Sequence, residues 1–578
     1  MRDEVAPRSR GWWLAAILLV AAALRSYELS WGLPRFVFFD SVVFYLRPAA
    51  DLLNEGRWAP QNAVHTPAMA YLVAGLGALL PDSVFGLTTF ESGARLAFVG
   101  RLATVVFSTA SVGAAYLLGR RLVGARAALL GAAAFALSPL HVLEAHRTHS
   151  DALMILLGLL AAHQAVLARD RGRGGPLLWA FALVGLSGGA KYTGLMCGAV
   201  PAWIALTWPG EGPRQRLRRL FFGCLATLGA FLFAILPLLL SPGPLVRDLS
   251  RLFEVAGVAG RFLGDFSWWT RPYLYPLVAA LPYVLGWTVY VCGLAGAVSL
   301  CRLPAARGPF LAATVPFFLI QGAAETGTPR YYLWLAPFLA IAAGHAIDRV
   351  WAWRRTAGPV LAAVVIGYTA VLTASHCARI EGRPGGIVLQ AIRERVRAER
   401  SRGRRLKVGY PAQLQARYDP VGAFLLGRKL DAAWLPPFQA VWGARDPLKR
   451  YRAWIRREQP DLILVTSWLE GGVARGEIPA AVGAFVEALE SGELGFEKVE
   501  DVRTEFFTQD LYLWADPTFD TVPVVGVYGY KLFEARRPAP PGHPTEGGPA
   551  PPAVPGATRA PRASPHPGVQ LQTTPGSA

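Results

Sequence analysis

Charged residues are scarce in this sequence of 578 residues. They make up 17% of the chain, against about 25% in an average soluble domain, while apolar residues make up 53%. So high an apolar fraction excludes a disordered chain. The apolar residues also stand in long uncharged blocks, which excludes an ordinary soluble enzyme and indicates a membrane protein.

Cysteine pairs and nucleotide-binding motifs are also lacking. The chain has five cysteines and no CxxC sequence, and four of the five lie in or beside apolar blocks, so neither a zinc site nor a disulfide framework is indicated. No cysteine follows Cys377, which excludes a disulfide within the C-terminal region. That region also contains neither a GxGxxG sequence nor a P-loop.

Acidic residues are outnumbered by basic ones, with 39 Asp and Glu against 58 Lys and Arg and a formal net charge of +19. Such a balance can indicate nucleic-acid binding. Here most of the arginines lie between apolar blocks, a pattern that orients membrane helices. We therefore expect the lipid bilayer, and no nucleic acid, to be the partner of most of these residues.

Eleven apolar segments approach the length of about 20 residues that crosses the hydrocarbon core. The first is predicted to be a retained helix and not a signal peptide, because it lacks a convincing small-residue cleavage site and further spans follow. The predicted spans are residues 11–29, 96–118, 124–140, 150–168, 176–190, 193–209, 220–241, 276–300, 308–323, 331–348 and 358–376.

The basic residues are distributed unevenly around these spans. If the N-terminus is cytoplasmic, the short outer turns carry only Arg147, Lys191 and Arg330. The inner segments carry Arg2, Arg8, Arg10, Arg120, Arg121, Arg126, Arg169, Arg171, Arg173, Arg214, Arg216, Arg218, Arg219, Arg302, Arg307, Arg349, Arg354 and Arg355. The positive-inside rule therefore predicts a multi-pass protein of the inner (plasma) membrane with a cytoplasmic N-terminus and an extracytoplasmic C-terminal region.

The first long outer loop, about residues 30–95, carries two predicted helices. Ser41–Glu55 is amphipathic and is predicted to end at Gly56. Pro67–Leu80 is apolar but too short to span the membrane, which is typical of an interfacial or re-entrant helix. Helices at about residues 41–80 therefore structure the outer face.

The C-terminal third, residues 377–536, returns to a soluble composition. Its strand and helix patterns alternate, which predicts a small extracytoplasmic α/β domain behind a transmembrane domain of residues 1–376. The strands are predicted at Leu406–Tyr410, Asp461–Thr466, Phe496–Arg503 and Val522–Phe533, and the helices at Leu448–Glu458 and Pro479–Leu489. Residues 537–578 are rich in proline and are predicted to be a disordered tail.

Polar groups at the predicted outer ends of the spans are functional candidates, because charged groups at membrane depth are costly. Asp40 follows an apolar run and stands just before Tyr45. It can cap the loop helix, or it can act as a general base that takes a proton from an attacking hydroxyl. His65 adds a group that titrates near neutral pH, although a capping or interface role is its simpler interpretation.

A cluster of histidines and acids lies between the third and fourth spans. It comprises His141, Glu144, His146, Arg147, His149 and Asp151. A metal site is one interpretation, but no HxxxH sequence with a glutamate base is present, so no metal is expected. The alternative is a wet loop in which Asp151 caps a helix, orients a substrate or holds a basic partner.

Two of the three outer cations belong to further clusters. Lys191 and Tyr192 follow Gly185–Ala190, a predicted glycine-rich turn that would let the backbone approach a ligand, so Lys191 either binds phosphate or extends to the interface. Arg330 and Tyr331 either grip phosphate or anchor the interface. A cation in a short outer turn is an exception to the positive-inside rule. This exception favours the functional interpretation.

Further sequence elements accompany these clusters in a fixed order. They are Leu24-Arg25, Asp40, Tyr45, Gly56, Trp58, His65-Thr66-Pro67, Arg101, Gly119-Arg120-Arg121-Leu122, Gly124, Arg147, Asp151, GLSGGAKYTG at 185–194 and PRYYLWLAPFLAI at 329–341. Together they resemble the GT-C superfamily of polytopic glycosyltransferases, in its bacterial protein-mannosyltransferase and aminoarabinose-transferase-like branch (glycosyltransferase family 39-like). The resemblance covers roughly residues 11–376.

Two positions depart from the pattern of this family. Ser41 replaces the second acid of the first-loop pair, and Thr66 replaces the first proline of a His-Pro-Pro motif. Asp40 is then the only acid in that motif. A base role for Asp40 would therefore not be shared, and a metal at this motif has little support.

The resemblance implies inverting transfer of a hexosyl or pentosyl group from a polyprenyl-phosphate carrier to a lipid, glycan or protein acceptor. Asp40 is the expected base, and Lys191 and Arg330 are expected to bind the leaving phosphate. Tyr45, His65, Asp151, Tyr192 and Tyr331 are expected to complete the substrate site. The leaving group is already an anion at neutral pH, so neither a metal nor another cofactor is expected.

Two other classes of protein are compatible with many spans and polar clusters. A multi-span transporter would more often show repeated halves with its substrate groups near the bilayer midplane. A non-catalytic membrane subunit of an envelope assembly complex would not bring the polar clusters together in space. The position of the clusters in the folded chain distinguishes these alternatives.

Overall fold

The structure is a computed structural model, and every structural statement below concerns the residues that it describes. These are residues 7–30, 41–58, 65–79, 89–240, 242–243, 246, 272–323, 329–380, 391–392, 394–399, 401–404, 406–410, 431–434, 447–466, 480–503 and 529–536. Asp40 and the tail at 537–578 therefore lie outside the described residues.

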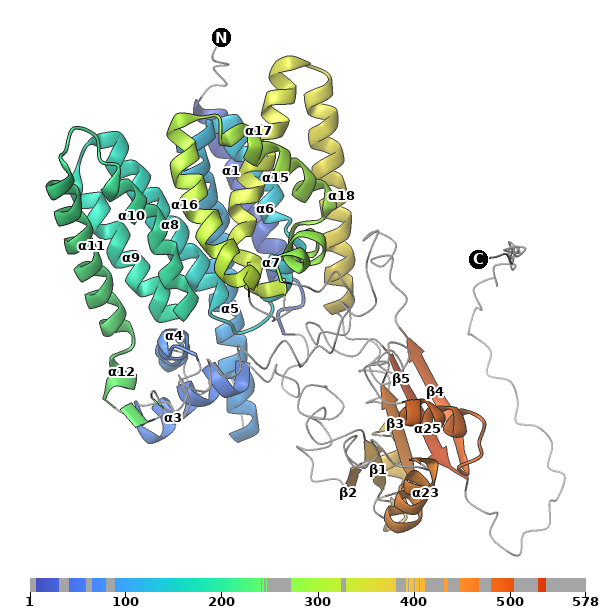
Figure 1. Cartoon of the computed structure of the whole chain (residues 1–578). Helices are drawn as coiled ribbons and strands as arrows, with labels where there is room; N and C mark the ends of the chain where they lie inside the picture. The colour runs from blue at the N-terminus through green and yellow to red at the C-terminus, as the bar shows by residue number, and fades with distance from the viewer. Residues whose placement is uncertain are drawn as a thin grey trace, which may run out of the picture. The chain divides into compact units, whose positions relative to one another are not determined.

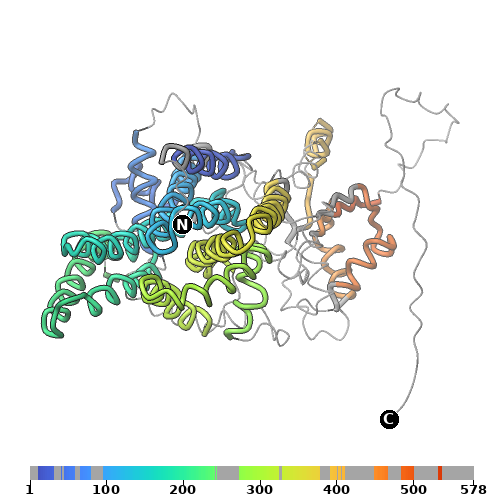
Figure 2. The backbone as a smooth tube through the Cα atoms, turned by 90° about the horizontal axis from the view of Figure 1, so that it is seen from above, coloured from blue at the N-terminus to red at the C-terminus, as the bar shows by residue number. Residues whose placement is uncertain are grey.

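A helical bundle forms the first two thirds of the chain, with most of its long helices running side by side (Figure 1; Figure 2 shows the same helices from above). Its elements are α1 (Pro7–Ser26), α5 (Thr89–Val123), α6 (Ala125–Ala136), α7 (Pro139–Glu144), α8 (Asp151–Arg171), α9 (Gly174–Ala190), η3 (Tyr192–Gly198), α10 (Ala199–Leu206), α11 (Pro213–Ala234), α12 (Leu236–Leu239), η5 (Pro276–Ala280), α14 (Leu281–Leu285), α15 (Trp287–Leu300), α16 (Pro304–Ala323), η6 (Pro329–Leu335), α17 (Ala336–Trp353) and α18 (Ala357–Ile380). Helix lies in each of the eleven segments predicted to span.

Within the described ranges, five helices are long and apolar enough to cross a membrane. They are Arg95–Val123, Asp151–Arg171, Pro213–Ala234, Pro329–Trp353 and Ala357–Cys377. The predicted span at 276–300 is broken, because Pro276–Leu285 and Trp287–Leu300 meet at 115°. Gly286, with φ 79°, provides the bend, and counting this pair as one span gives six. The other apolar helices are shorter, which is typical of spans assembled from pieces.

Small residues let the backbones of the central helices come into direct contact. A Cβ atom on Gly344 of α17 would collide with Ala127 and Gly131 of α6. In a bilayer the hydrophobic effect does not drive helices together, so close van der Waals packing at such positions has to hold them. The α6–α17 contact is therefore a main support of the bundle.

Two loop helices lie at one end of the bundle (Figure 1). The π-helical turn η1 (Val42–Leu46) continues into α3 (Arg47–Glu55), which ends at Gly56 with φ 63°, as predicted. The second helix, α4 (Ala68–Ala78), is also found where an apolar run predicted it. Both pack with α5 around the buried residues Tyr45, Met69 and Leu96.

A five-stranded sheet with the order β2-β1-β3-β5-β4 follows in sequence. Its strands are β1 (Lys407–Tyr410), β2 (Asp431–Trp434), β3 (Leu462–Thr466), β4 (Phe496–Arg503) and β5 (Gly529–Ala535). β1 pairs in parallel with β2 and β3, whereas β5 pairs antiparallel with β3 and β4. Every predicted strand is present in part, while β2 was not predicted.

Two helices pack with this sheet, α23 (Pro447–Glu458) and α25 (Ala480–Glu490), both within two residues of the predicted bounds. Tyr451 of α23 stacks on Phe485 of α25 with 4.0 Å between ring centroids. Burial raises the pKa of Tyr451 to about 12, so this phenol is neutral at physiological pH. The core of the sheet region is thus apolar.

Replacing Gly344 with leucine tests the packing of α6 against α17. We expect Gly344→Leu to lower the midpoint of thermal unfolding in detergent by many degrees, because the new side chain must push two backbones apart. Gly367→Leu is the matched control, since nothing lies within 4 Å of a Cβ placed on this glycine of α18. Equal midpoints for the two variants would contradict the proposed role of the contact.

Candidate functional site

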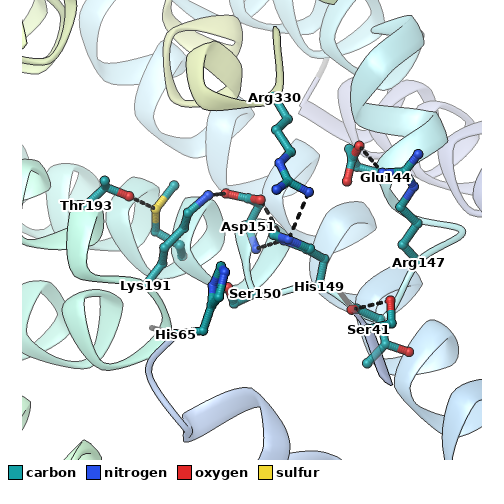
Figure 3. Close-up of polar contacts among 12 residues, drawn as sticks. Ser41, His65, Glu144, Arg147, His149, Ser150, Asp151, Lys191, Thr193 and Arg330 are labelled. Atoms are coloured by element: carbon teal, nitrogen blue, oxygen red, sulfur yellow. Dashed lines mark hydrogen bonds and ion pairs between the residues drawn. The ribbon is translucent and has the colours of Figure 1, made fainter. Parts of the chain in front are cut away.

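Four charged or titratable side chains from three segments meet at the ends of α8, α9 and η6 (Figure 3). The Lys191 ammonium lies 2.5 Å from Oδ1 of Asp151, and Nδ1 of His149 lies 2.6 Å from Oδ2 of the same carboxylate. Nη1 of Arg330 approaches Nε2 of His149 at 3.4 Å. Asp151 and His149 are buried, which strengthens each of these interactions.

Local structure explains why these side chains converge. Asp151 is the first residue of α8, where the positive end of the helix dipole favours a carboxylate. Lys191 stands just beyond the last turn of α9 in an extended conformation, so its side chain leaves the helix direction. Arg330 lies in the first turn of the 3₁₀ helix η6. All three residues thus stand at element termini and not in the middle of a span.

Tyr331 provides the aromatic surface of this cluster. Its ring centroid lies 5.2 Å from the Lys191 ammonium and 5.6 Å from the guanidinium carbon of Arg330. One ring therefore flanks both cations that the sequence singled out. Tyr192 packs elsewhere, with its ring 6.5 Å from that of Phe231 on α11.

The loop-helix residues join the same cluster. The Tyr45 hydroxyl lies 3.2 Å from Nδ1 of His65 and 3.0 Å from Oγ of Ser150. The His149 ring lies 5.5 Å from the ring of Tyr45 and 6.0 Å from that of His65. Tyr45 and His65 are therefore neighbours of the Asp151 network, although they come from a segment far away in sequence.

The neighbour of Asp40 in the chain is fixed to the same loop. Ser41 is buried and donates a hydrogen bond from its hydroxyl to the carbonyl oxygen of Thr148, at 2.9 Å. Asp40 itself is not among the described residues, so its base role stays a prediction. The attachment of Ser41 nevertheless connects the first-loop motif to the loop that precedes Asp151.

The predicted glycine-rich turn is wrong, because Gly185–Ala190 form the last turns of α9. A Cβ on Gly185 would collide with the backbone of Thr227, and one on Gly189 with Ala234, both on α11. These glycines face a neighbouring helix and not a ligand. Their function is close packing of α9 on α11, which fixes the end of the helix from which Lys191 extends.

A second polar cluster surrounds Arg25, which the sequence analysis named only as one residue of a motif. This side chain is fully buried, and its Nε donates to Oγ of Ser108 at 2.7 Å. Nη1 donates to the carbonyl of Ala136 at 2.8 Å, and Nη2 lies 2.9 Å from Nδ1 of His141. Since a guanidinium can only donate, Nδ1 accepts and the proton of His141 resides on Nε2. An arginine within an apolar run was the available signal.

This cluster holds α7 and therefore the loop that follows it. Arg25 comes from α1, Ser108 from α5, Ala136 ends α6 and His141 lies on α7. The loop after α7 carries His149 and leads to Asp151. Arg25 thus acts through other groups as a positioning residue for the candidate site.

No group of three His, Cys, Asp or Glu side chains suited to a metal ion occurs among the residues that the structure covers. Asp151 and His149 form a close pair of ligand types, and Lys191 already occupies one oxygen of Asp151. The described part of the site holds three cationic side chains, Lys191, Arg330 and Arg147, beside the carboxylates of Asp151 and Glu144.

One known family model matches part of the chain. The profile of the PMT_2 family, described as dolichyl-phosphate-mannose-protein mannosyltransferase, matches residues 85–240. The matched segment extends over α5 to α12 and contains His149, Asp151 and Lys191. This match covers about a quarter of the chain and agrees with the predicted class of protein, a glycosyltransferase that uses a lipid-phosphate sugar.

Solved structures of three membrane transferases resemble the chain in part. ArnT from Cupriavidus metallidurans, bound to undecaprenyl phosphate, is 16% identical over 68% of this chain and 73% of its own, with a TM-score of 0.45. AglB from Archaeoglobus fulgidus, an oligosaccharyltransferase in complex with an inhibitory peptide and a dolichol-phosphate, is 14% identical over 86% and 74%, with a TM-score of 0.47. The S. cerevisiae protein O-mannosyltransferase Pmt1-Pmt2 complex, bound to the sugar donor, is 17% identical over 43% and 34%, with a TM-score of 0.31. No curated protein sequence matches the chain significantly.

Substituting Arg25 tests its positioning role. Arg25→Leu removes the hydrogen bonds that Arg25 donates to Ala136, Ser108 and His141. Each buried acceptor left without a donor lowers the free energy of unfolding by about 1–3 kcal/mol. We expect a marked loss of thermal stability in detergent and loss of transferase activity, with partial rescue of both by Arg25→Lys. Arg57→Leu, at a half-exposed arginine, should change neither. An Arg25→Leu variant as stable and active as the wild type would exclude the role.

Proposed function

We propose that the chain moves a sugar from a polyprenyl-phosphate carrier to an extracytoplasmic acceptor, with inversion at the anomeric carbon. The observation that carries this proposal is the position of Lys191 and Arg330. They come from distant parts of the sequence, flank one tyrosine ring and belong to one buried network. Two fixed cations beside an aromatic ring suit a phosphate that is linked to a sugar.

The charge of the leaving group explains why two cations are useful. The donor is a phosphodiester with one negative charge, and departure of the sugar converts it into a phosphate monoester with additional charge. Lys191 and Arg330 therefore stabilise the transition state more than the bound donor, which is what accelerates a reaction. The acceptor oxygen forms the new bond to the anomeric carbon while the bond to the phosphate oxygen breaks, and Asp40 takes the acceptor proton.

The remaining residues have supporting roles in this proposal. Asp151 holds Lys191 in place, Tyr331 forms the apolar wall between the cations, and Tyr45 with His65 borders the site. Tyr192 follows Lys191 in the chain and is proposed as a more distant member of the substrate site, with its ring near Phe231 of α11. Apolar helices of the bundle accommodate the lipid tail.

We also propose the placement of the chain in the membrane. The positive-inside rule puts the N-terminus in the cytoplasm, and eleven predicted spans then put the C-terminal region on the outer side of the inner membrane. The site and the α/β domain of residues 377–536 then lie on the extracytoplasmic side. The supporting observation is that Lys191 and Arg330, the cations opposed to the positive-inside rule, share one cluster with Asp151. Lipid, glycan and protein acceptors all reach such a site.

The position of the polar groups argues against the transporter alternative. Asp151 begins α8, Lys191 follows α9 and Arg330 precedes α17, so the network lies at helix ends. Convergence of the clusters also disfavours a purely structural assembly subunit. A panel of radiolabelled polyprenyl-phosphate sugars, incubated with the purified protein and membrane extract, tests the proposal. Labelled product supports transfer, whereas uptake of label into vesicles without product would support transport.

Asp40→Asn removes the proposed base without changing the size of the side chain. General-base catalysis typically contributes about 10²–10⁴-fold, so turnover should fall by that range while the affinity for the donor stays near that of the wild type. Single-turnover transfer and donor binding measure the two quantities separately. A transfer rate close to that of the wild type would show that Asp40 is not the base.

Lys191→Met tests phosphate binding, but it also leaves the Asp151 carboxylate buried without its closest cation. Breaking a buried ion pair typically costs about 3–5 kcal/mol, so the single variant should be destabilised. The double variant Lys191→Met/Asp151→Asn removes that charge and should recover stability. We expect donor affinity to stay at least about tenfold weaker in both, a loss of about 1.4 kcal/mol. Recovery of affinity together with stability would assign Lys191 a structural role only.

A further inference from the structure

Glu144, the last residue of α7, carries a buried carboxylate that the proposed reaction does not use. Its side chain is 5% exposed, and neither carboxylate oxygen accepts a hydrogen bond from any residue that the structure describes. Arg147 lies nearby, with Nη1 3.4 Å from Oε1. Burial of an ionised carboxylate without hydrogen-bond donors is costly, and such groups in native proteins usually have a partner or a function.

Asp151 differs from Glu144 in the partners of its carboxylate oxygens. Seven residues further along the chain, Asp151 is equally buried, but one of its oxygens lies 2.5 Å from Lys191 and the other 2.6 Å from His149. Lys191 therefore donates a hydrogen bond to Oδ1 of Asp151, while Oδ2 lies beside His149 without a hydrogen bond among the described residues. Glu144 retains acceptor capacity at both of its oxygens.

The pair of Glu144 and Arg147 belongs to the same loop as the rest of the site. Thr148, next to Arg147, accepts the hydrogen bond of Ser41, and His149 contacts Arg330. Figure 3 shows the Arg330 guanidinium between Asp151 on one side and the Glu144–Arg147 pair on the other. Glu144 and Arg147 therefore belong to the loop that also places His149 beside Arg330.

We propose that Glu144 and Arg147 form the subsite for the sugar of the donor, an inference that rests on the proposed function. A sugar hydroxyl donates to the carboxylate of Glu144 and accepts from the guanidinium of Arg147, so both charged groups are used at once. A phosphate can only accept and would be repelled by Glu144. Both side chains are buried, so a folded protein surface cannot reach them directly.

Two lipids that differ only by the sugar test this subsite. The full chain in lipid nanodiscs is titrated with undecaprenyl phosphate and with undecaprenyl-phosphate hexoses and pentoses, and the sugar lipid that binds most tightly is used. We expect Glu144→Gln and Glu144→Ala to weaken binding of that lipid about tenfold or more, because each lost hydrogen bond to a charged group costs about 1.5–3 kcal/mol. Their affinity for undecaprenyl phosphate should remain within about twofold of the wild type.

Two controls separate recognition from folding. Glu55→Gln, at a half-exposed carboxylate on α3, should change neither affinity. Thermal unfolding of each variant shows whether it folds, because Glu144→Gln removes the charge that is paired with the buried guanidinium of Arg147. Lys191→Met/Asp151→Asn should weaken binding of both lipids, in contrast to the Glu144 variants.

Three results would overturn the sugar subsite. They are unchanged affinity of both Glu144 variants for the sugar lipid, equal weakening for both lipids, and a wild-type protein that binds no sugar lipid more tightly than undecaprenyl phosphate. Failure of the proposed function has a different signature. In that case the wild type would bind neither kind of lipid and would transfer no sugar.

Discussion

The carboxylate of Asp151 is the group from which the geometry of the site follows. It is buried at the start of α8, where the helix dipole favours its charge, and it contacts Lys191 and His149 directly. Through His149 it also determines where Arg330 lies. A buried charge of this kind constrains its surroundings, because any movement that removes a partner exposes the full cost of burial.

The loop before Asp151 extends this constraint to the rest of the bundle. His141 is held by Arg25 of α1, Thr148 by Ser41, and Ser150 by Tyr45. The first helix, the loop helices and the later spans thus all connect to one stretch of about ten residues. Residues with no direct part in the chemistry can therefore control it, since they determine where the charged groups of this stretch lie.

Several parts of this arrangement were predictable from the sequence. Lys191 and Arg330 were identified because they oppose the positive-inside rule, and Asp151 because it stands at the end of an apolar run. The helix at 41–55 was predicted from the spacing of its apolar residues and from the glycine that follows it. The helix at 67–80 was predicted from its apolar run. These signals are local, so no knowledge of the partner segments was needed.

Other parts depend on contacts between distant segments and could not be predicted. The sequence of Gly185–Ala190 is compatible with a ligand-binding turn or with close helix packing, and only the position of α11 distinguishes the two. The bend at Gly286 and the short strand β2 carry weak local signals for the same reason. Glu144 was part of a recognised cluster, but its lack of donors is visible only once its neighbours are placed.

The packing of α9 on α11 has a mechanical consequence. In α11 only Gly223 is buried and most other residues are exposed, so this helix lies at the periphery of the bundle. The same helix touches the backbone of α9 at Gly185 and Gly189, one turn before Lys191. Lateral pressure and bilayer thickness act first on such a peripheral helix. The bilayer around α11 is thereby coupled to the ammonium group of Lys191, through the packing of α11 on α9.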